Sequence, residues 1–284
     1  MKAIKKLIRQ IITFLLDCFL FFLEETYIGR KLLLRIGGRS MDIVTEVHYN
    51  GHKLFFPTPN GVCKFRAVTF NTKEPETLDW LDCIPKGDIL WDIGANIGLY
   101  SVYAAKARKC NVYAFEPSVF NLELLARSIN LNKVSSNVCI CPLPLSDNLG
   151  SNDMHLTSTD WGGAMSTFGE DYGFDGKAIK EVFRFQTIGL TMVDAMKMLG
   201  IPKPDFIKID VDGIEHLILG AGFELLKSVK GVLVEVNDDF EDLALGCQKV
   251  LENAGLVLEK KLHSEMFDNS ESYGRLYNQI WIRP

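Results

Sequence analysis

The chain has 284 residues, of which 47% are hydrophobic, and its formal net charge is −5 at pH 7. This length suits one large domain, or one domain with an appendage. Because the chain has no net positive charge, nucleic acid is not expected as a partner. The seven cysteines have neither a small-domain disulfide pattern nor a metal-ligand spacing, which is typical of reduced thiols in a cytoplasmic protein.

The first 24 residues contain a very apolar run, Ile11–Leu23, after four Lys and Arg residues. The run is short for a membrane-spanning helix, and no small-residue cleavage site follows it. At helical spacing its polar residues form one narrow stripe, broken by Leu20, which predicts an amphipathic helix. Residues 1–24 therefore either lie in a membrane surface, which makes the protein peripheral at the membrane, or pack against the domain or the second copy in a homodimer.

The next segment alternates polar and apolar residues around Asn50-Gly51, a dipeptide typical of two-residue hairpins. We therefore expect an N-terminal helical region over residues 1–36 and a lead-in with a hairpin over residues 37–76. From residue 77 to residue 284, strands alternate with helices. This alternation predicts an α/β domain whose parallel sheet is covered by helices on both faces.

Within the α/β domain the pattern predicts seven strands: Ile89–Ile93, Val112–Phe115, Val138–Cys141, Phe206–Ile209, Val232–Val236, Leu256–Glu259 and Leu276–Ile282. The predicted helices are Gly98–Ala107, Val119–Leu131, Met192–Leu199, Ile214–Gly220 and Phe240–Ala254. The interval from about 146 to 186 breaks this rhythm and is rich in Gly, Ser, Thr, Asp and aromatic residues. It is a substrate-binding insertion, or else an insertion with a purely structural role or a dimer contact.

A glycine loop, Asp-x-Gly-x-x-x-Gly, follows the first strand of this domain, where open parallel sheets bind ligands. Gly94 permits a left-handed backbone, and Gly98 opens a helix whose free N–H groups attract an anion. The loop lacks the Gly-Lys-Ser/Thr of a P-loop, and Asn96 replaces the middle glycine of a dinucleotide loop. Asp92 would be unfavourable beside a diphosphate but favourable beside an ammonium group. The loop thus favours S-adenosylmethionine, which carries an ammonium group and no phosphate.

An acid at the end of the second strand, Glu116, stands where two ribose hydroxyls are expected to donate hydrogen bonds. The same acid occurs in NAD sites, so alone it does not separate the two cofactors. It is equally compatible with a solvated carboxylate ahead of the helix that follows Pro117-Ser118. Together with Asp92 and Gly94, it favours S-adenosylmethionine.

Four stretches resemble the FkbM-type S-adenosylmethionine-dependent methyltransferases: WDIGANIGLYSVYAAK, VYAFEPSVFNLELLARSINLN, PLSDNLG and PDFIKIDVDGIEHLILGAG. EPETLDWL and TMVDAM are similar to the family as well, and the resemblance covers roughly Lys73 to Val236. It implies a class I methyltransferase fold, a Rossmann-like three-layer sandwich with a seven-stranded, mostly parallel sheet whose last strand is antiparallel. It also implies methyl transfer to oxygen, often on a sugar or another glycosylated or polyketide product.

Position by position, the resemblance implies which residues bind the cofactor. Asp92, Gly94, Asn96 and Gly98 would form the cofactor loop, and Glu116 would hold the ribose. The turn at Leu143 and Pro144 would lie against the adenine. Proline at this position departs from the expected small residue, and it has no N–H group for a backbone contact.

The strand Phe206–Ile209 leads to the candidate catalytic group. Lys208 and Asp210 share one face of the chain, and Asp210 falls at the carboxyl end, where the transferable methyl group is expected. An ion pair explains the two residues structurally. A hydroxyl acceptor also loses a proton, which a carboxylate or an imidazole can accept. Asp210 is the first candidate for this role, His216 the second, and His263 a weaker third.

Two further pairs of residues have the spacing of helix capping boxes rather than of catalytic groups. Asp212 precedes Glu215 by three residues, and Thr191 precedes Asp194 by three residues, each just before an apolar run. We therefore expect both pairs to stabilise helix starts.

A metal site is a further hypothesis. Glu235 and Asn237 end the next strand on one side, and with Asp210 they would offer three oxygen ligands to Mg²⁺. The sequence does not fix whether these side chains converge, so the use of a divalent metal stays open.

The sequence thus predicts an S-adenosylmethionine-dependent O-methyltransferase that acts on a saccharide or glycoconjugate. Aromatic residues of the insertion would stack on a sugar ring or form a small core: Trp161, Phe168, Tyr172 and Phe174. One alternative is an NAD(P)-dependent oxidoreductase, against which Asp92 and Asn96 argue. The other is a non-catalytic membrane-surface binding protein, against which acids at three successive strand ends argue.

Overall fold

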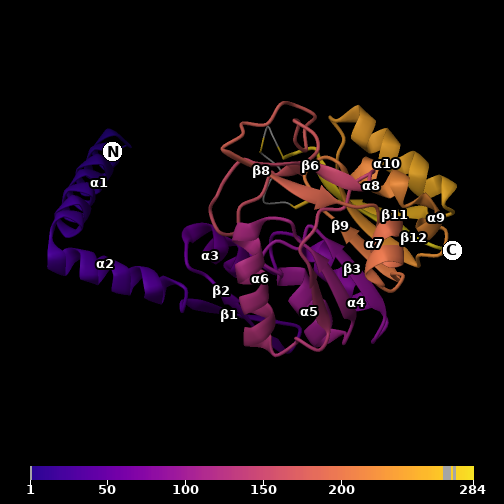
Figure 1. Ribbon diagram of the computed structural model, residues 1–284, viewed down its shortest axis with the longest axis horizontal. Helices are drawn as coiled ribbons and strands as arrows, with labels where there is room; N and C mark the ends of the chain where they lie inside the picture. The colour runs from indigo at the N-terminus through magenta and orange to yellow at the C-terminus, as the bar shows by residue number, and fades with distance from the viewer. Residues whose placement is uncertain (1, 265–269, 271–272) are drawn as a thin grey trace. The chain divides into compact units, whose positions relative to one another are not determined.

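The computed structural model describes residues 2–264, 270 and 273–284, and the chain divides into two compact units, Met1–Val44 and Thr45–Pro284. Figure 1 colours it from indigo at the N-terminus to yellow at the C-terminus. The first unit contains two helices and the second contains the α/β sheet. The division follows Val44 rather than residue 36, because the second helix continues to Ser40.

Seven strands form the central sheet of the second unit. Their spatial order is β11 (Val257–Leu262), β12 (Leu276–Ile282), β10 (Gly231–Asn237), β9 (Phe206–Ile209), β3 (Ile89–Ile93), β4 (Asn111–Phe115) and β5 (Val138–Cys141). β12 is antiparallel to both neighbours, and the pairs from β10 to β5 are parallel. This sheet confirms the class I methyltransferase fold that the sequence predicted, with its antiparallel last strand.

Helices cover both faces of the sheet (Figure 1). One face carries α4 (Pro75–Cys83), α5 (Leu99–Ala107) and α6 (Val119–Asn132), and the other carries α7 (Met192–Leu199), α8 (Glu215–Ala221), α9 (Phe223–Leu226) and α10 (Glu241–Asn253). Alternate strand residues enter the two cores: Leu90 packs with the first set of helices and Trp91 with the second. Strands buried on both faces explain the near-continuous apolar runs in the sequence.

The lead-in folds as β1 (Val44–Tyr49), β2 (His52–Pro57) and α3 (Gly61–Val68). Asn50 and Gly51 have φ values of 44° and 76°, as a two-residue hairpin requires. Leu54 and Phe56 are fully buried in the core beneath α4, α5 and α6. From Thr45 onward the lead-in is therefore part of the same unit as the sheet rather than a segment of its own.

The insertion contains a three-stranded antiparallel sheet in the order β7 (Thr167–Phe168), β6 (Gly150–Leu156) and β8 (Phe183–Gly189). Met154, Leu156 and Phe168 are buried in the core that α7 to α10 cover. The insertion is thus anchored to the sheet domain by packing. Its strand β8 extends three residues past the predicted end at residue 186, because it pairs with β6 as far as Gly189.

In the first unit, α1 (Lys2–Glu25) meets α2 (Tyr27–Ser40) at a tight corner. Thr26 caps α2, because its side-chain oxygen accepts a hydrogen bond of 3.0 Å from the Gly29 N–H. Gly29 lies so close to α1 that a Cβ atom there would be 2.2 Å from the Leu23 carbonyl oxygen. Among the residues that the structure describes, no helix combines the length and apolarity needed to cross a bilayer.

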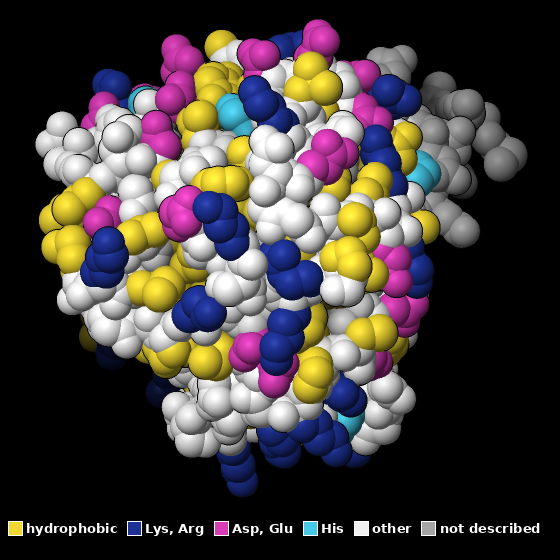
Figure 2. Space-filling view, turned by 90° about the vertical axis from the view of Figure 1, so that its right-hand side faces the viewer, with side chains coloured by type: hydrophobic (Ala, Val, Ile, Leu, Met, Phe, Trp, Pro, Cys, Tyr) yellow, Lys and Arg dark blue, Asp and Glu magenta, His cyan; other side chains and the backbone are white. Residues whose placement is uncertain are grey.

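Charged side chains of both signs are spread over the surface. On the face shown in Figure 2, Lys and Arg side chains are interspersed with acidic and hydrophobic ones. Some of the exposed charges form ion pairs, such as Lys230 with Asp88 and Asp205. Exposed pairs of this kind each contribute less than about 1 kcal/mol, so the two cores dominate the stability of the fold.

Candidate active site

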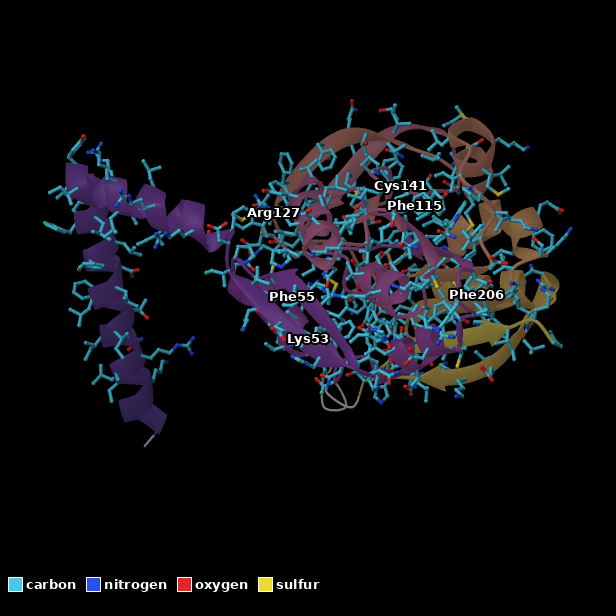
Figure 3. All side chains as sticks on the ribbon, turned by 90° about the horizontal axis from the view of Figure 1, so that it is seen from below. Lys53, Phe55, Phe115, Arg127, Cys141 and Phe206 are labelled. Carbon is cyan, nitrogen blue, oxygen red and sulfur yellow. The ribbon has the colours of Figure 1, made fainter. Side chains whose placement is uncertain are left out.

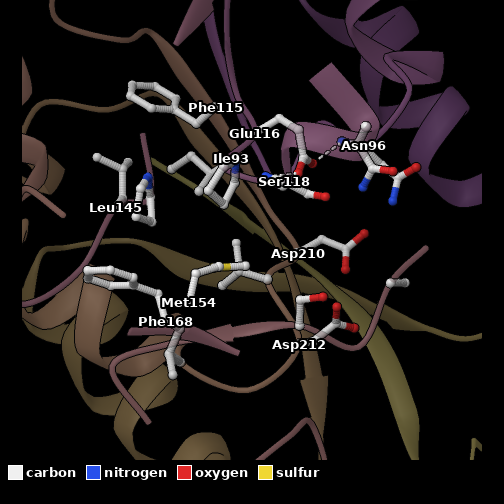
Figure 4. Close-up of a pocket in the computed structure, with 18 of the residues that line it drawn as sticks. Ile93, Asn96, Phe115, Glu116, Ser118, Leu145, Met154, Phe168, Asp210 and Asp212 are labelled. Atoms are coloured by element: carbon white, nitrogen blue, oxygen red, sulfur yellow. Dashed lines mark hydrogen bonds between the residues drawn. The ribbon is translucent and has the colours of Figure 1, made fainter. Parts of the chain in front are cut away.

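Two cavities open where the parallel strands end. The smaller has a volume of about 590 Å³, and the larger has a volume of about 1120 Å³. Both are lined by Gly94, Asn96, Ala164, Asp210 and Asp212. The cavities therefore meet at these residues, and Figure 4 shows Asp210 between Glu116 and Asp212.

One end of the smaller cavity is apolar. It is lined by Ile93, Phe115, Leu143, Pro144, Leu145, Met154, Phe168 and Ile214. In Figure 4 the labelled apolar side chains lie on the opposite side of the cavity from Asn96 and Asp210. The Pro144 carbonyl oxygen accepts a hydrogen bond of 3.2 Å from the Leu190 N–H, so Pro144 offers its ring to this end of the cavity. Leu143 and Pro144 thus line the apolar end in which the sequence placed an adenine ring.

Glu116 lies in the smaller cavity with 5% of its surface exposed. Its Oε2 accepts a hydrogen bond of 2.7 Å from the Asn96 N–H, and its Oε1 accepts one of 2.8 Å from the Ser118 N–H. Burial raises its pKa to about 7, and these two hydrogen bonds oppose that rise. Because each carboxylate oxygen has a second lone pair, Glu116 can still accept hydrogen bonds from a ligand. It is therefore a fixed acceptor in a cavity rather than a solvated helix-start residue.

The loop between β3 and α5 is shaped by its contacts with the rest of the protein. Gly94 has a φ of 85°, and a Cβ atom there would be 1.8 Å from the Asp210 carbonyl oxygen. Glycine is thus required by the approach of the chain after β9. Asn96 donates from Nδ2 to the Gly163 carbonyl oxygen at 2.8 Å, which ties the loop to the insertion. Gly98 packs on Leu125 of α6, and its N–H donates to the Ala95 carbonyl oxygen rather than remaining free for an anion.

The structure does not place Asp92 at the cavity, where the sequence predicted that it binds the cofactor. It is 1% exposed and is not among the described residues that line either cavity. Its Oδ2 accepts a hydrogen bond of 2.5 Å from the Ser101 Oγ, and its Oδ1 lies 3.8 Å from the Lys208 Nζ. Strand alternation places Asp92 on the same face as Leu90, toward α5, so it does not face the space in which a ligand ammonium would lie.

Asp210 forms an ion pair with Lys208, one of the two explanations that the sequence left open, with 3.1 Å between Lys208 Nζ and Asp210 Oδ2. Lys208 is 2% exposed, while Asp210 reaches both cavities. Burial by itself would raise the pKa of Asp210. The positive charges of Lys208, Lys73 and Arg66 outweigh that effect and bring the pKa below its usual value. Asp210 is therefore an ionised carboxylate where the two cavities meet.

The predicted capping box of Asp212 and Glu215 is wrong. Glu215 accepts hydrogen bonds from the N–H groups of Val211 and Gly213, at 2.9 and 3.0 Å. Asp212 has a φ of 63° and accepts a hydrogen bond of 2.7 Å from the Met165 N–H, so it holds the insertion instead of capping α8. Burial raises the pKa of Asp212 to about 6.

The second predicted capping box is confirmed at the start of α7. The Thr191 Oγ1 accepts a hydrogen bond of 3.0 Å from the Asp194 N–H, and Asp194 Oδ2 accepts one of 3.2 Å from the Thr191 N–H. These two residues stabilise a helix end and are not among the described residues of either cavity.

His216 does not lie at the site. Its ring is 6.0 Å from the ring of Phe240, and a Cβ atom at Gly246 of α10 would contact it. The side chain points from α8 toward α10, because that face of α8 forms the helix–helix contact. His263, in contrast, lines the larger cavity and lies 5.4 Å from the ring of Tyr277.

The carboxylates that could hold a metal differ from the predicted set. Asn237 is 2% exposed, and its Oδ1 accepts a hydrogen bond of 3.0 Å from the Asp239 N–H. Asp212 takes its place, because Asp210, Asp212 and Glu235 have ligand atoms within 4.8 Å of one another.

Lysine side chains lie beside this carboxylate cluster. Burial and the neighbouring charge of Asp210 raise the pKa of Glu235 well above its usual value, although Lys73 opposes the rise. This shift favours the protonated form of Glu235, while Lys208 pairs with Asp210. A protonated carboxyl group is a poor ligand for Mg²⁺, so the arrangement does not favour a divalent metal.

The larger cavity also contains residues that the sequence did not indicate. Arg66 and Lys73 line it, and both come from the lead-in rather than from the sheet strands. Arg66 donates from Nε to the Gly162 carbonyl oxygen at 2.8 Å, which joins α3 to the insertion. Glu74 forms an ion pair with Lys73 and accepts a hydrogen bond of 2.8 Å from the Tyr100 hydroxyl. No local motif marks Arg66, whereas Lys73 and Glu74 stand at the start of the stretch that resembles the family.

The insertion forms part of the cavity wall. Asn121 of α6 donates to the Gly163 carbonyl oxygen at 3.1 Å and accepts from the Gly162 N–H at 2.9 Å. Of the predicted aromatic residues, Phe168 lines the smaller cavity, and Phe174 stacks at 5.4 Å on Tyr273, which lines the larger one. The other two predicted aromatic residues, Trp161 and Tyr172, are not among the described residues that line either cavity.

Comparisons with known proteins agree with this geometry. The chain is 25% identical over 162 residues to the hexuronic acid methyltransferase AglP of Haloferax volcanii, covering 53% of this chain and 56% of that relative. It is 27% identical over 175 residues to the methyltransferase sdnD of Sordaria araneosa, covering 54% of this chain and 67% of that one. The match to AglP thus spans little more than half of that protein.

Among solved structures, Pyrococcus horikoshii TYW2 in complex with MeSAdo has a TM-score of 0.46 at 12% identity, covering 84% of this chain and 70% of that one. The precorrin-6y C5,15-methyltransferase of Geobacter metallireducens has a TM-score of 0.43 at 14% identity, covering 74% and 86%. Residues 92–277 match the family model of the methyltransferase FkbM domain. The chain therefore belongs to the FkbM methyltransferase family.

Proposed function

We propose that this protein is an S-adenosylmethionine-dependent O-methyltransferase that acts on a hydroxyl group of a saccharide or glycoconjugate. The observation that carries the proposal is the meeting of the two cavities at Asp210. One cavity has the residues for a nucleoside, and the other has the volume for an acceptor. The ionised carboxylate of Asp210 lies between the two cavities, where it would accept the proton of the acceptor hydroxyl.

The residues of the smaller cavity fit S-adenosylmethionine. The cavity has one apolar end and one polar end. Its apolar end, which includes Phe168 and Pro144, would hold the adenine, and Glu116 would accept hydrogen bonds from the ribose hydroxyls. Asp210 is the aspartate that faces this cavity from the end of β9, whereas Asp92 does not line it.

When bound, S-adenosylmethionine supplies an activated methyl group on a sulfonium. The protein has to orient the acceptor oxygen, exclude water and accept the hydroxyl proton. Asp210 would accept that proton, because it is an ionised carboxylate where the two cavities meet. His263, in the larger cavity, is the second candidate base now that His216 lies elsewhere.

A saccharide acceptor is supported by two observations. The relative from Haloferax volcanii is a hexuronic acid methyltransferase. The larger cavity combines polar side chains with aromatic ones, among them Arg66, Asn278, Phe65 and Tyr273, as sugar-binding sites do. The family favours methyl transfer over the oxidoreductase alternative. The non-catalytic alternative leaves the ionised Asp210 in an open cavity without a role.

Mass spectrometry of glycoconjugates from cells with and without the gene tests the acceptor class. We expect a glycan that carries one methyl group in the first cells and lacks it in the second. Complementation with the Asp210→Asn variant should leave the glycan unmethylated, and complementation with Asp239→Asn, an exposed acid outside the cavities, should restore it. Identical glycan profiles in both cell lines would exclude a saccharide acceptor.

A further inference from the structure

The two N-terminal helices are basic, whereas the rest of the chain is acidic. α1 and α2 together contain eight Lys and Arg residues against three Asp and Glu, while the other residues contain 23 against 33. The basic side chains of α2 are all exposed, and α2 has no acidic residue: Arg30, Lys31, Arg35 and Arg39. A positive surface of this kind complements an anionic partner.

The same helices expose a large apolar surface. In α1, eleven large hydrophobic side chains are between 45% and 66% exposed, and in α2 the side chains of Ile28 and Leu34 are 79% and 78% exposed. Figure 3 shows the side chains of both helices projecting on all sides. An apolar surface of this extent marks an interaction site, because soluble proteins rarely leave one in water.

Several polar residues of α1 form one stripe along the helix. Lys6, Arg9, Thr13 and Asp17 lie together along the helix, and the Thr13 hydroxyl donates to the Arg9 carbonyl oxygen at 3.0 Å. Most of the other side chains of α1 that the structure describes are apolar. A helix with one narrow polar stripe and a wide apolar face lies in the plane of a membrane interface, with the stripe toward the head groups.

We infer that α1 and α2 bind the surface of an anionic lipid bilayer. The apolar side chains would enter the boundary between head groups and acyl chains, and the basic side chains of α2 would contact anionic head groups. A second copy that pairs through the same two helices would also cover the apolar surface, but it would place the basic side chains of two α2 helices near each other, and α2 has no acidic residue to balance them. Anionic lipid head groups supply the negative charge. This inference goes beyond the proposed methyl transfer and does not depend on it.

Cosedimentation with vesicles tests the inference on the full-length chain. Vesicles of phosphatidylcholine alone are compared with vesicles that contain phosphatidylserine as well, at low and at high salt. The main variant is R30Q/K31Q/R35Q/R39Q. The matched control, K109Q/K180Q/K203Q/K249Q, removes the same charge from exposed positions in the sheet domain. A third variant, L15E/F19E/F22E, removes apolar surface and adds negative charge. Unchanged thermal unfolding shows that each variant is folded.

We expect the wild type and the control to bind the phosphatidylserine vesicles, and binding to weaken at high salt. The α2 variant should bind more than tenfold more weakly, because each basic residue near an anionic surface contributes roughly a fivefold factor. The L15E/F19E/F22E variant should not bind. Equal binding of the α2 variant and the control would overturn the inference. So would a wild type that ignores vesicles and forms a dimer that L15E/F19E/F22E dissociates, since a second copy would then cover the helices.

Discussion

Lys208 Nζ lies 3.1 Å from Asp210 Oδ2 and 3.8 Å from Asp92 Oδ1, although the Lys208 side chain is only 2% exposed. One buried cation therefore lies beside two carboxylates with different surroundings. Asp92 is enclosed and bonded to Ser101, whereas Asp210 reaches both cavities. The pair Lys208–Asp210 thus connects the core of the sheet to the candidate active site.

Replacing Lys208 with methionine should destabilise the protein by about 3–5 kcal/mol, because it leaves the buried Asp92 and the partly buried Asp210 without their cation. Urea unfolding measures the loss. Lys230→Met is the matched control, since Lys230 also pairs with two aspartates but is 52% exposed, and it should cost less than about 1 kcal/mol. Adding Asp92→Asn to the first variant should recover part of the stability. Equal losses for both lysines would mean that Lys208 does not act as a buried counter-charge.

Asp210→Asn should lower the rate of methyl transfer by a factor of about 100 or more, because the amide cannot accept the hydroxyl proton. The affinity for S-adenosylhomocysteine should change much less, since Glu116 and the apolar end of the cavity remain. Calorimetry gives the affinity, and a labelled-methyl assay on the acceptor gives the rate. A variant that loses binding as severely as turnover would show that Asp210 holds the cofactor rather than the proton.

The affinity for S-adenosylhomocysteine should rise with pH between pH 6 and pH 8. The raised pKa of Glu116, about 7, means that this carboxyl group is mostly protonated at pH 6 and ionised at pH 8. Ribose hydroxyls donate to the ionised form, so binding should strengthen roughly tenfold over this range. Glu116→Gln should bind weakly and without this slope, and Glu123→Gln, an exposed acid on α6, should behave as the wild type. A slope that survives in Glu116→Gln would have to come from another group, such as Asp212.

The protonation of Glu116 has the opposite effect on the stability of the free protein, which should fall as the pH rises. Because the folded pKa of Glu116 lies above its usual value of 4.5, its stabilising contribution is complete below that value and is lost as the pH rises through about 7. Glu116→Gln, which cannot ionise, should lack this loss. Thermal unfolding of the free protein across the same pH range measures it.

Gly94→Ala should be far more destabilising than Gly87→Ala. Both glycines have left-handed backbones, with φ values of 85° and 87°. A Cβ atom at Gly94 would be 1.8 Å from the Asp210 carbonyl oxygen, whereas no atom lies within 4 Å of a Cβ atom at Gly87. We expect about 1–2 kcal/mol for Gly87→Ala from backbone strain, and at least about 2 kcal/mol more for Gly94→Ala. Similar unfolding temperatures for the two variants would show that the loop and the end of β9 are not in close contact.

Much of the sheet domain could be predicted from the sequence, because its signals are local. The strands Val138–Cys141, Phe206–Ile209 and Leu276–Ile282 agree with the structure at both ends, and so does the helix Met192–Leu199. Apolar runs bounded by turn residues specify such elements directly. The strands of the insertion were missed, since β6 and β8 are exposed at many positions and are specified by their pairing.

The site was harder to predict, because its geometry depends on which way side chains point. Glu116 and Asp210 follow strand ends, and both face a cavity as expected. Asp92 carries the same kind of signal, yet strand alternation turns it toward α5 and Ser101. His216 lies one residue beyond the start of α8, but the turn of the helix directs it to α10. Arg66 joins the site only through tertiary packing, which no local pattern encodes.

A crystal structure of the protein with S-adenosylhomocysteine tests the central claim most directly. We predict the adenine among Pro144, Phe168 and their apolar neighbours, the ribose hydroxyls on the Glu116 carboxylate, and the sulfur directed toward the larger cavity near Asp210. A ligand bound elsewhere, or one whose ribose makes no contact with Glu116, would contradict this account of the site.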